Sequence, residues 1–253
     1  MISEAVILAA GLGTRLREYV GDTPKPLVKI LGLPLIWYPL ANLVRIGVKN
    51  FHIIVNRENY ARLKDILSRI NNIKINFVIN NHPERGNGYS LYLGIKEVES
   101  KYFYLIMSDH IHHTEILDRF SRCSKTGDIV ICVDSKPSLI NIDEATKVLV
   151  KNNFVVDIGK KLKYFTHIDT GLFIVNKNLY NIIHEYCLNN QTVELSGIIK
   201  YLVSSQYKVI GEDIAGLYWL EIDTSDDLRK AEENAREFIE ELINTLSLVV
   251  DRI

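Results

Sequence analysis

The chain has 253 residues, of which 47% are hydrophobic and 24% charged, and this composition fits one large α/β domain with a sizeable buried core. The 30 basic and 31 acidic residues give a formal net charge of −1, so no overall field favours binding to a nucleic-acid backbone. Three widely spaced cysteines, no signal-peptide pattern and no apolar run of membrane-spanning length lead us to expect a cytoplasmic chain without a membrane segment.

Short β-branched apolar runs alternate with longer segments of helical period through the first half of the chain. This alternation is typical of a mostly parallel sheet with helices on both faces. Strands are expected at 4–8, 51–55, 75–79, 103–107 and 128–133. Helices are expected from Pro34 to about Ile46, at 59–70 and at 90–98.

The pattern changes after residue 140, where short strands and hairpins replace the alternation. Asn152-Asn153 joins strand-like runs at 145–151 and 154–158 and favours a tight hairpin turn. Further strands are expected at 171–175, 207–211 and 217–222, and helices at 177–188, 194–204 and from Ser225 to about Leu246. We therefore predict a doubly wound, Rossmann-like α/β domain with a mostly parallel mixed sheet. It would consist of a first half (1–135), a smaller β-rich half (136–224) and a C-terminal helix (225–253).

The first expected strand runs directly into the Gly-rich segment LAAGLGTRL at 8–16. Such a strand-to-helix turn leaves backbone N–H groups unpaired, and they bind anions well. Small residues at 9, 10, 11 and 13 let the backbone approach a triphosphate and a flat base, and Arg15 offers a bidentate donor to phosphate oxygens. The turn alone could equally be a tight packing turn. The candidate nucleotide-binding residues here are Leu8, Ala9, Ala10, Gly11, Gly13, Thr14 and Arg15.

A second motif follows at 23–27, where TPKPL holds Lys25 in a rigid, extended segment between two prolines. Rigid placement suits a catalytic cation that also binds the nucleotide, although a Pro-rich loop with a solvated lysine is the alternative. Together, LAAGLGTRL and PKPL resemble the signature of the sugar-phosphate nucleotidyltransferases. The resemblance implies a doubly wound fold in which the Gly-rich turn holds the nucleotide, while Arg15 and Lys25 act in catalysis by neutralising the phosphates.

The chemistry of nucleotidyl transfer explains the remaining acidic candidates. A phosphate oxygen of the acceptor attacks the α-phosphorus in line and pyrophosphate leaves, so the protein mainly positions reactants and stabilises charge. Several phosphates in one site call for a metal with oxygen ligands, and we expect Mg²⁺. Asp109 follows the apolar run FYLIM and Asp223 follows YWLEI, so both are candidate metal ligands; either could instead cap a helix.

The segment at 80–91, NNHPERGNGYSL, is the candidate base-binding loop. Asn81 and the chain at Gly86 and Asn87 offer donors and acceptors of the kind that contact the edge of a pyrimidine, although an Asn/Gly loop before a helix would have the same composition. GNGYSL is similar to the base-binding segment of cytidylyltransferases, and this similarity implies CTP. The segments DEATKV (143–148), IGK (158–160) and DTG (169–171) resemble successive segments of archaeal and thermophilic CTP:inositol-1-phosphate cytidylyltransferases.

The second resemblance assigns acceptor-binding residues. It implies that Lys147 meets the phosphate of the incoming inositol phosphate and that Asp169 and Thr170 face its hydroxyls, with Glu144 as a further candidate. Without the resemblance, Lys147 would be an exposed hairpin lysine and Asp169 a turn residue. Three histidines lie close together in the sequence, but we expect solvated side chains or a phosphate contact by His110 rather than a transition-metal site; they are His110, His112 and His113.

The expected partners are therefore CTP and a small phosphorylated polyol, with no nucleic acid. One alternative is a phosphocholine acceptor, for which an aromatic cage could be built from Tyr164, Phe165, Tyr218 and Trp219. A second is a sugar-1-phosphate enzyme that uses UTP or dTTP. A third is a silent nucleotide-binding regulatory subunit, which would have no chemical need for Arg15, Lys25, Asp109 and Asp223 together. Relatives of this kind often continue into a membrane-embedded synthase, so such a domain or partner, and a homo-oligomer, are both compatible with the sequence.

Overall fold

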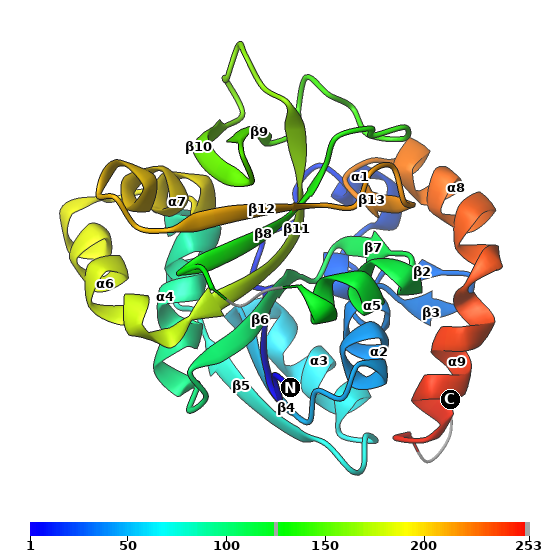
Figure 1. The fold of residues 1–253 in the computed structure, drawn as a ribbon. Helices are drawn as coiled ribbons and strands as arrows, with labels where there is room; N and C mark the ends of the chain where they lie inside the picture. The colour runs from blue at the N-terminus through cyan, green and yellow to red at the C-terminus, as the bar shows by residue number, and fades with distance from the viewer. Residues whose placement is uncertain (124–125, 251–253) are drawn as a thin grey trace.

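The computed structural model describes residues 1–123 and 126–250, and over these residues the chain forms one nine-stranded sheet with helices on both faces (Figure 1). The strand order is β5-β4-β1-β6-β11-β8-β12-β10-β9. The first four strands in this order are parallel: β5 (Lys74–Ile79), β4 (Asn50–Val55), β1 (Glu4–Ala9) and β6 (Tyr102–Met107). The predicted doubly wound α/β fold with a mixed sheet is confirmed, and its parallel pairs are concentrated in the first half of the chain.

The second half of the chain supplies most of the antiparallel pairs. β11 (His167–Asn176) lies antiparallel between β6 and β8 (Ile129–Asp134), and β12 (Val209–Asp213) runs parallel to β8. A hairpin of β9 (Lys147–Lys151) and β10 (Phe154–Gly159) completes the sheet, and β9 also pairs with β11. Strands from both halves of the sequence therefore share one continuous sheet.

The turn of this hairpin is formed by the two asparagines from which the hairpin was predicted. Asn152 and Asn153 both have positive φ, at 49° and 65°. A two-residue hairpin turn that matches the twist of its strands needs this conformation, which asparagine tolerates better than most residues. The predicted hairpin is confirmed.

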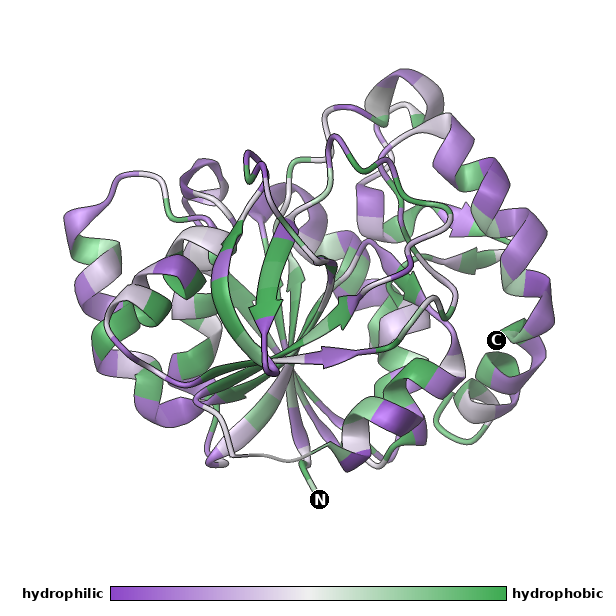
Figure 2. Cartoon of the chain, turned by 45° about the horizontal axis from the view of Figure 1, so that its top comes forward, coloured by the Kyte–Doolittle hydropathy of each residue, from purple (hydrophilic) through white to green (hydrophobic). Residues whose placement is uncertain are grey.

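Two groups of helices cover the two faces of the sheet. One group consists of α2 (Trp37–Arg45), α3 (Arg57–Leu67), α5 (Thr114–Arg122), α8 (Ser225–Asn234) and α9 (Ile239–Ser247). The other consists of α4 (Asn87–Glu97), α6 (Tyr180–Asn189) and α7 (Leu195–Ser204). Because successive strand residues point to opposite faces, β1 places Ile7 in the first core and Val6 and Leu8 in the second. Figure 2 shows the central strands as largely hydrophobic and the outer surfaces of the helices as mostly hydrophilic.

Short elements connect these layers. They are α1 (Arg17–Val20), β2 (Lys29–Ile30), β3 (Leu33–Pro34), β7 (His110–His112), β13 (Trp219–Glu221) and 3-10 turns at Lys25–Leu27, Pro83–Arg85, Lys177–Leu179 and Ala235–Glu237. Among the described residues, no helix has the length and apolar character needed to cross a membrane.

The helix predicted from Pro34 begins later, at Trp37. Pro34 instead ends a small hairpin in which Lys29 pairs with Pro34, and Leu31 and Gly32 turn the chain with positive φ. Pro39 is the proline in the first turn of α2, where a backbone N–H has no partner within the helix and none is lost.

The single C-terminal helix predicted over 225–253 is divided into α8 and α9. The chain leaves the helical conformation at Phe238, whose φ of −125° follows a short 3-10 turn. Phe238 is buried and its ring contacts the rings of His113 and Tyr218, at centroid distances of 5.2 and 5.7 Å. The break therefore inserts an aromatic anchor into the core and lets α9 pack along α2. Residues 251–253 of the predicted helix lie outside the described part of the chain.

The strand predicted at 217–222 does not join the large sheet. β13 pairs with β7 in a separate antiparallel ribbon, with Glu221 opposite His110. β7 was not among the predicted strands, and α5 begins after it at Thr114, with His113 as its capping residue. The ribbon places the residues after β6 directly beside those at the end of β13.

Candidate active site

A cavity of about 690 Å³ opens at the carboxyl ends of β1 and β6. This edge of a parallel sheet is where doubly wound folds bind ligands. The walls of the cavity come from the Gly-rich turn, the loop before α4, the β7–β13 ribbon, the end of β10, the beginning of β11, and the first turn of α7.

The Gly-rich turn is held rigid from behind. Asn56 and Asn59 donate their side-chain N–H groups to the carbonyls of Ala10 and Ala9, at 3.1 and 2.7 Å. A Cβ added at Gly11 would meet no protein atom within 4 Å, so packing within the protein does not require glycine there. A glycine that faces an open cavity on a fixed backbone allows close approach by a ligand.

Only part of the predicted nucleotide-binding turn lines the cavity. Leu8, Ala9, Ala10 and Gly11 do so, whereas Gly13, Thr14 and Arg15 lie outside its lining. Gly13 has a φ of 59° and packs against the Lys25 side chain, where an added Cβ would be 3.0 Å from Lys25 Cβ. The turn therefore sets the position of Lys25 as well as one wall.

Lys25 lies at the centre of the charged groups. Its ammonium donates to Asp109 Oδ2 and to Asp223 Oδ1, both at 2.6 Å. Burial opposes the charged form of Lys25, but the two carboxylates outweigh this and hold its pKa above the usual value. Burial would likewise raise the pKa of Asp109, but Lys25 and His110 beside it keep that pKa below its usual range. Lys25 and Asp109 are thus both charged at neutral pH.

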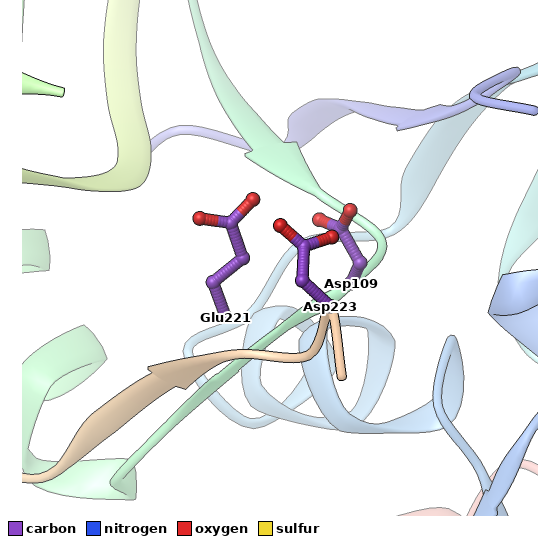
Figure 3. Close-up of side chains that lie close together, drawn as sticks. All are labelled: Asp109, Glu221 and Asp223. Carbon is purple, nitrogen blue, oxygen red and sulfur yellow. The ribbon is translucent and has the colours of Figure 1, made fainter. Parts of the chain in front are cut away.

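A third carboxylate joins this pair. Oxygen atoms of Asp109, Glu221 and Asp223 all lie within 4.8 Å of one another, and Figure 3 shows the three side chains pointing to the same side of the β7–β13 ribbon. Burial, with the charges of Asp109 and Asp223, raises the pKa of Glu221. Three converging carboxylates repel one another unless cations lie among them, and oxygen ligands of this kind suit a hard divalent ion. We call these residues the acidic triad; its donor set fits a divalent metal.

Neither aspartate of the triad is a helix cap. Thr224 caps α8 and forms a capping box with Asp227, and the backbone N–H of Asp223 donates to Asp227. Glu221 was not predicted as a metal ligand from the sequence, although it lies two residues before Asp223. Residues at this spacing in an extended chain point to the same side, so the spacing alone could have identified Glu221 as a third candidate ligand.

Arg15 connects the triad to the second half of the chain. Its guanidinium lies 2.6 Å from Asp223 Oδ2 and 2.7 Å from Glu144 Oε2. Arg15 and Glu144 are both exposed by more than half, so the Arg15–Glu144 pair contributes little stability. Arg15 is therefore free to exchange Glu144 for an incoming phosphate at low cost.

The floor of the cavity is formed by a ring stack. His110 Nδ1 lies 2.8 Å from Asp109 Oδ1, and its ring stacks on Trp219 at 6.1 Å with an interplanar angle of 7°. Gly171, with a φ of 74°, lies so close that a Cβ there would be 2.7 Å from His110 Cδ2. The floor therefore fixes the orientation of the Asp109 carboxylate.

The other two clustered histidines have structural contacts, and the expectation of a solvated side chain is wrong for His112. His112 is fully enclosed; its Nε2 lies 2.8 Å from the carbonyl oxygen of Thr170, and burial lowers its pKa to about 3. The His113 side chain accepts a hydrogen bond from the N–H of Glu115 and caps α5.

The predicted acceptor-binding residues divide between the cavity and the core. Asp169 lines the cavity, and burial raises its pKa to about 6. Thr170 does not face the cavity: its hydroxyl is buried and donates to the carbonyl of Cys132 at 2.9 Å. Successive residues of β11 point to opposite faces, which explains why only one of the pair reaches the cavity.

Lys147 also differs from the expectations. It is only 8% exposed, so it is not a solvated hairpin lysine, and its ammonium donates to three backbone carbonyls rather than pointing into the cavity. Glu144 is exposed beside Arg15 and lies outside the lining of the main cavity.

The base-binding loop is joined to the start of α7. Gly86 and Asn87 line the cavity, whereas Asn81 lies outside it and accepts a hydrogen bond from Arg57. The Asn87 side chain accepts from the N–H of Leu195 at 2.8 Å, so its oxygen supports α7. Gly86 packs so closely on Val193 that an added Cβ would be 2.8 Å from the Val193 carbonyl oxygen.

Three lysines that the sequence analysis did not select line the cavity on the side away from the Gly-rich turn. They are Lys160, Lys161 and Lys200. Lys200 pairs with Asp157 at 2.9 Å. Lys160 and Lys161 follow β10 directly. A Lys-Lys pair at the end of a strand could have identified them from the sequence. These cations suit an anionic group at this side of the cavity.

Comparisons with known proteins agree with this geometry. The family model described as nucleotidyl transferase matches residues 4–237. The chain is 32% identical over 233 residues to the bifunctional IPC transferase and DIPP synthase of Aquifex aeolicus, covering 92% of this chain and 52% of the relative. It is 37% identical over 227 residues to the protein of the same name from Thermococcus kodakarensis, covering 90% and 49%. The chain thus spans about half the length of these relatives.

A solved structure matches over its whole length. The inositol-1-phosphate CTP transferase from T. maritima aligns with a TM-score of 0.85 and 29% sequence identity, covering 97% of this chain and 96% of that chain. The described fold is therefore that of a known nucleotide-dependent transferase.

Proposed function

The chain belongs to the nucleotidyl transferase family, and we propose that it transfers CMP from CTP to 1L-myo-inositol 1-phosphate, giving CDP-inositol and pyrophosphate. The observation that carries this proposal is the position of Lys25, 2.6 Å from two carboxylates of the acidic triad, in a cavity with the Gly-rich turn on one side and further lysines on the other. Two anionic substrates can meet over this centre. The names of the relatives and of the solved structure support CTP and inositol 1-phosphate as those substrates.

In this proposal the nucleotide lies on the side of the Gly-rich turn. The base would fit between Ala9, Ala10 and Gly11 on one side and Gly86 and Asn87 on the other, because both groups of residues line the same cavity. Arg15 and Lys25 would exchange carboxylates for phosphate oxygens and neutralise the charge that develops on leaving pyrophosphate.

The acceptor lies on the opposite side. Lys160 and Lys161 would bind its phosphate and Asp169 its hydroxyls. An oxygen of the acceptor phosphate then forms a bond to the α-phosphorus, and the bond from that phosphorus to the bridging oxygen of pyrophosphate breaks. The attacking oxygen is already anionic at neutral pH, so no general base is needed.

We further propose that the acidic triad holds Mg²⁺. The bound ion would withdraw charge from the phosphates and help orient them. Asp109 is held in place by His110, and Asp223 by the bond from its backbone to Asp227, so two of the ligands are oriented before any ion binds. Within the described residues, 1–123 and 126–250, none of the three cysteines forms a disulfide, in keeping with a reducing cytoplasm as the site of the reaction.

A phosphocholine acceptor receives less support. Of the four aromatic residues that could form a cage, only Trp219 lines the cavity, and its ring is stacked on His110. Tyr164 is 83% exposed, and Tyr218 packs on Phe238 in the core. The described cavity therefore offers carboxylates and lysines rather than an aromatic cage.

Pyrophosphate release tests the proposal. CTP, UTP, dTTP, ATP and GTP are each combined with inositol 1-phosphate, phosphocholine and glucose 1-phosphate in the presence of Mg²⁺. We expect the highest kcat/KM with CTP and inositol 1-phosphate. A higher kcat/KM with UTP and glucose 1-phosphate would overturn the substrate assignment, and no turnover with any pair would support a silent nucleotide-binding protein.

A further inference from the structure

Lys147 is a buried cation at the point where three strands meet. It is the first residue of β9, and its backbone lies opposite Gly159 of β10 and Ile168 of β11. Its side chain is almost fully enclosed, and its ammonium lies 5.9 Å from the centre of the Phe165 ring. Burying an ammonium is costly, so a lysine here needs compensating contacts.

Those contacts are backbone carbonyls. The ammonium donates to the carbonyl oxygens of Asp143 at 3.2 Å, Ala145 at 3.4 Å and Lys160 at 3.0 Å. An ammonium has three donors, and each finds one acceptor. Within the described ranges, 1–123 and 126–250, Lys147 makes no ion pair with a carboxylate, so its charge remains unneutralised.

The three carbonyls come from two segments of the chain, 143–146 and 160–161, and each segment contributes residues to the cavity lining. Ala145 and Thr146 line the cavity, and the carbonyl of Thr146 accepts a hydrogen bond from the N–H of Asp169 at 2.9 Å. Lys160 and Lys161 line it as well. A single ammonium therefore joins the segment that positions Asp169 to the segment that carries the two exposed lysines.

We propose that Lys147 is a positioning residue for the acceptor side of the active site, which holds Lys160 and Lys161 in place against the 143–146 segment without itself touching the acceptor. The inference rests on the proposed function, because it assumes that the acceptor phosphate binds at these two lysines. It places the effect of Lys147 on acceptor binding and not on CTP, whose wall is formed by the Gly-rich turn and the 86–87 loop.

The test compares Lys147→Met with wild type and with a control, Lys151→Met, an exposed lysine at the other end of the same strand. Methionine keeps the length of the side chain and removes its donors. We expect the KM for inositol 1-phosphate to rise about tenfold to hundredfold, while the Kd for CTP, measured by calorimetry without acceptor, changes less than twofold. The control should match wild type in both quantities.

A second comparison separates positioning from direct binding. Lys147→Met is introduced into a background that carries both Lys160→Met and Lys161→Met, and the added effect on acceptor KM should be much smaller than in the wild-type background, because the two lysines that it positions are gone. A fully multiplicative effect would show that Lys147 binds the acceptor itself and would overturn the proposal. An unchanged acceptor KM in Lys147→Met, or an equal loss of CTP affinity, would also overturn it.

Wild-type turnover is measured first. No turnover with CTP and inositol 1-phosphate would count against the proposed function, whereas turnover with an unaffected Lys147→Met variant would count against this inference alone. If thermal melts show that Lys147→Met does not fold, the same measurements are made with Lys147→Arg. The planar guanidinium of arginine keeps the charge but cannot meet all three carbonyls, so acceptor KM should again rise.

Discussion

Replacing Lys25 with methionine removes a cation on which both the stability and the proposed activity of the site depend. The Lys25 ammonium lies 2.6 Å from Asp109 and from Asp223, and the Lys25 side chain is 10% exposed. Its loss leaves the three carboxylates of the acidic triad facing one another. Breaking a largely buried ion pair costs about 3 kcal/mol, which corresponds to a fall in Tm of about 6–12 °C for a domain of this size.

Two assays measure the consequences. Thermal melts of the wild type and Lys25→Met are recorded without metal and across a Mg²⁺ titration, and pyrophosphate release gives kcat at saturating Mg²⁺. Because Lys25 and a metal ion would both neutralise the same carboxylates, Mg²⁺ should raise the Tm of the variant more than that of the wild type. We expect kcat to fall about 100- to 1,000-fold, the usual effect of removing one group that stabilises transition-state charge.

An equal Mg²⁺-induced rise in Tm for both proteins would show that Lys25 does not neutralise the carboxylates of the metal site. An unchanged kcat would refute the catalytic role. Lys29→Met serves as the control, because Lys29 is an exposed lysine nearby in the chain that lies outside the cavity; it should behave as wild type.

Three further variants test other parts of the site. Glu221→Gln should raise the Mg²⁺ concentration needed for half-maximal activity by roughly tenfold or more, as measured by metal titration of pyrophosphate release; an unchanged requirement would remove Glu221 from the metal site. Gly11→Ala should leave the free energy of unfolding, measured by urea denaturation, within about 0.5 kcal/mol of wild type while weakening CTP binding, measured by calorimetry, roughly tenfold. Position 171 has a positive φ beside His110, so Gly171→Ala should lower the free energy of unfolding by about 1–3 kcal/mol. Equal CTP affinity in Gly11→Ala and wild type would contradict the contact of Gly11 with the nucleotide. His112→Asn should reduce the pH dependence of stability, because burial lowers the pKa of His112 to about 3 in the folded state. Below an unfolded pKa near 6.5, the unfolded state therefore binds a proton that the folded state does not. Between pH 6 and pH 4 the wild type should lose about 1.4 kcal/mol of unfolding free energy per pH unit relative to the variant. Parallel unfolding curves at pH 7 and pH 5 with no such difference would contradict the burial of a neutral His112.

Local sequence signals predicted the parts of the site that depend on local backbone geometry. The Gly-rich turn follows β1 as its glycines predicted. Lys25 lies between the two prolines of its motif, but it begins a 3-10 turn and is not in the extended segment that was expected. Asp109 and Asp223 each end an apolar run, and the fold brings them together as expected. Their roles in binding and catalysis stay predictions.

Pairing between strands that are distant in the sequence determines the features of the site that local sequence patterns did not predict. Thr170 points into the core because of its register on β11, and Lys147 is buried because β9 lies between β10 and β11 at that point. Glu221 joins the triad through the β7–β13 ribbon. A strand was predicted at the position of β13, but β7 and the pairing of the two strands were not predicted. The break at Phe238 likewise follows from its aromatic contacts with His113, which lies more than a hundred positions away in the sequence, and with Tyr218. Each of these differences results from tertiary contacts that override a local pattern.

The central claim is that the α-phosphate of CTP is transferred to the phosphate of an inositol phosphate. The most direct measurement follows the label from [α-³²P]CTP and, in a parallel reaction, from [γ-³²P]CTP, with inositol 1-phosphate and Mg²⁺. We expect the α-label to appear in CDP-inositol and the γ-label in pyrophosphate, in equal amounts. Release of α-label as free CMP, or no acceptor-dependent transfer of the α-label, would contradict the claim.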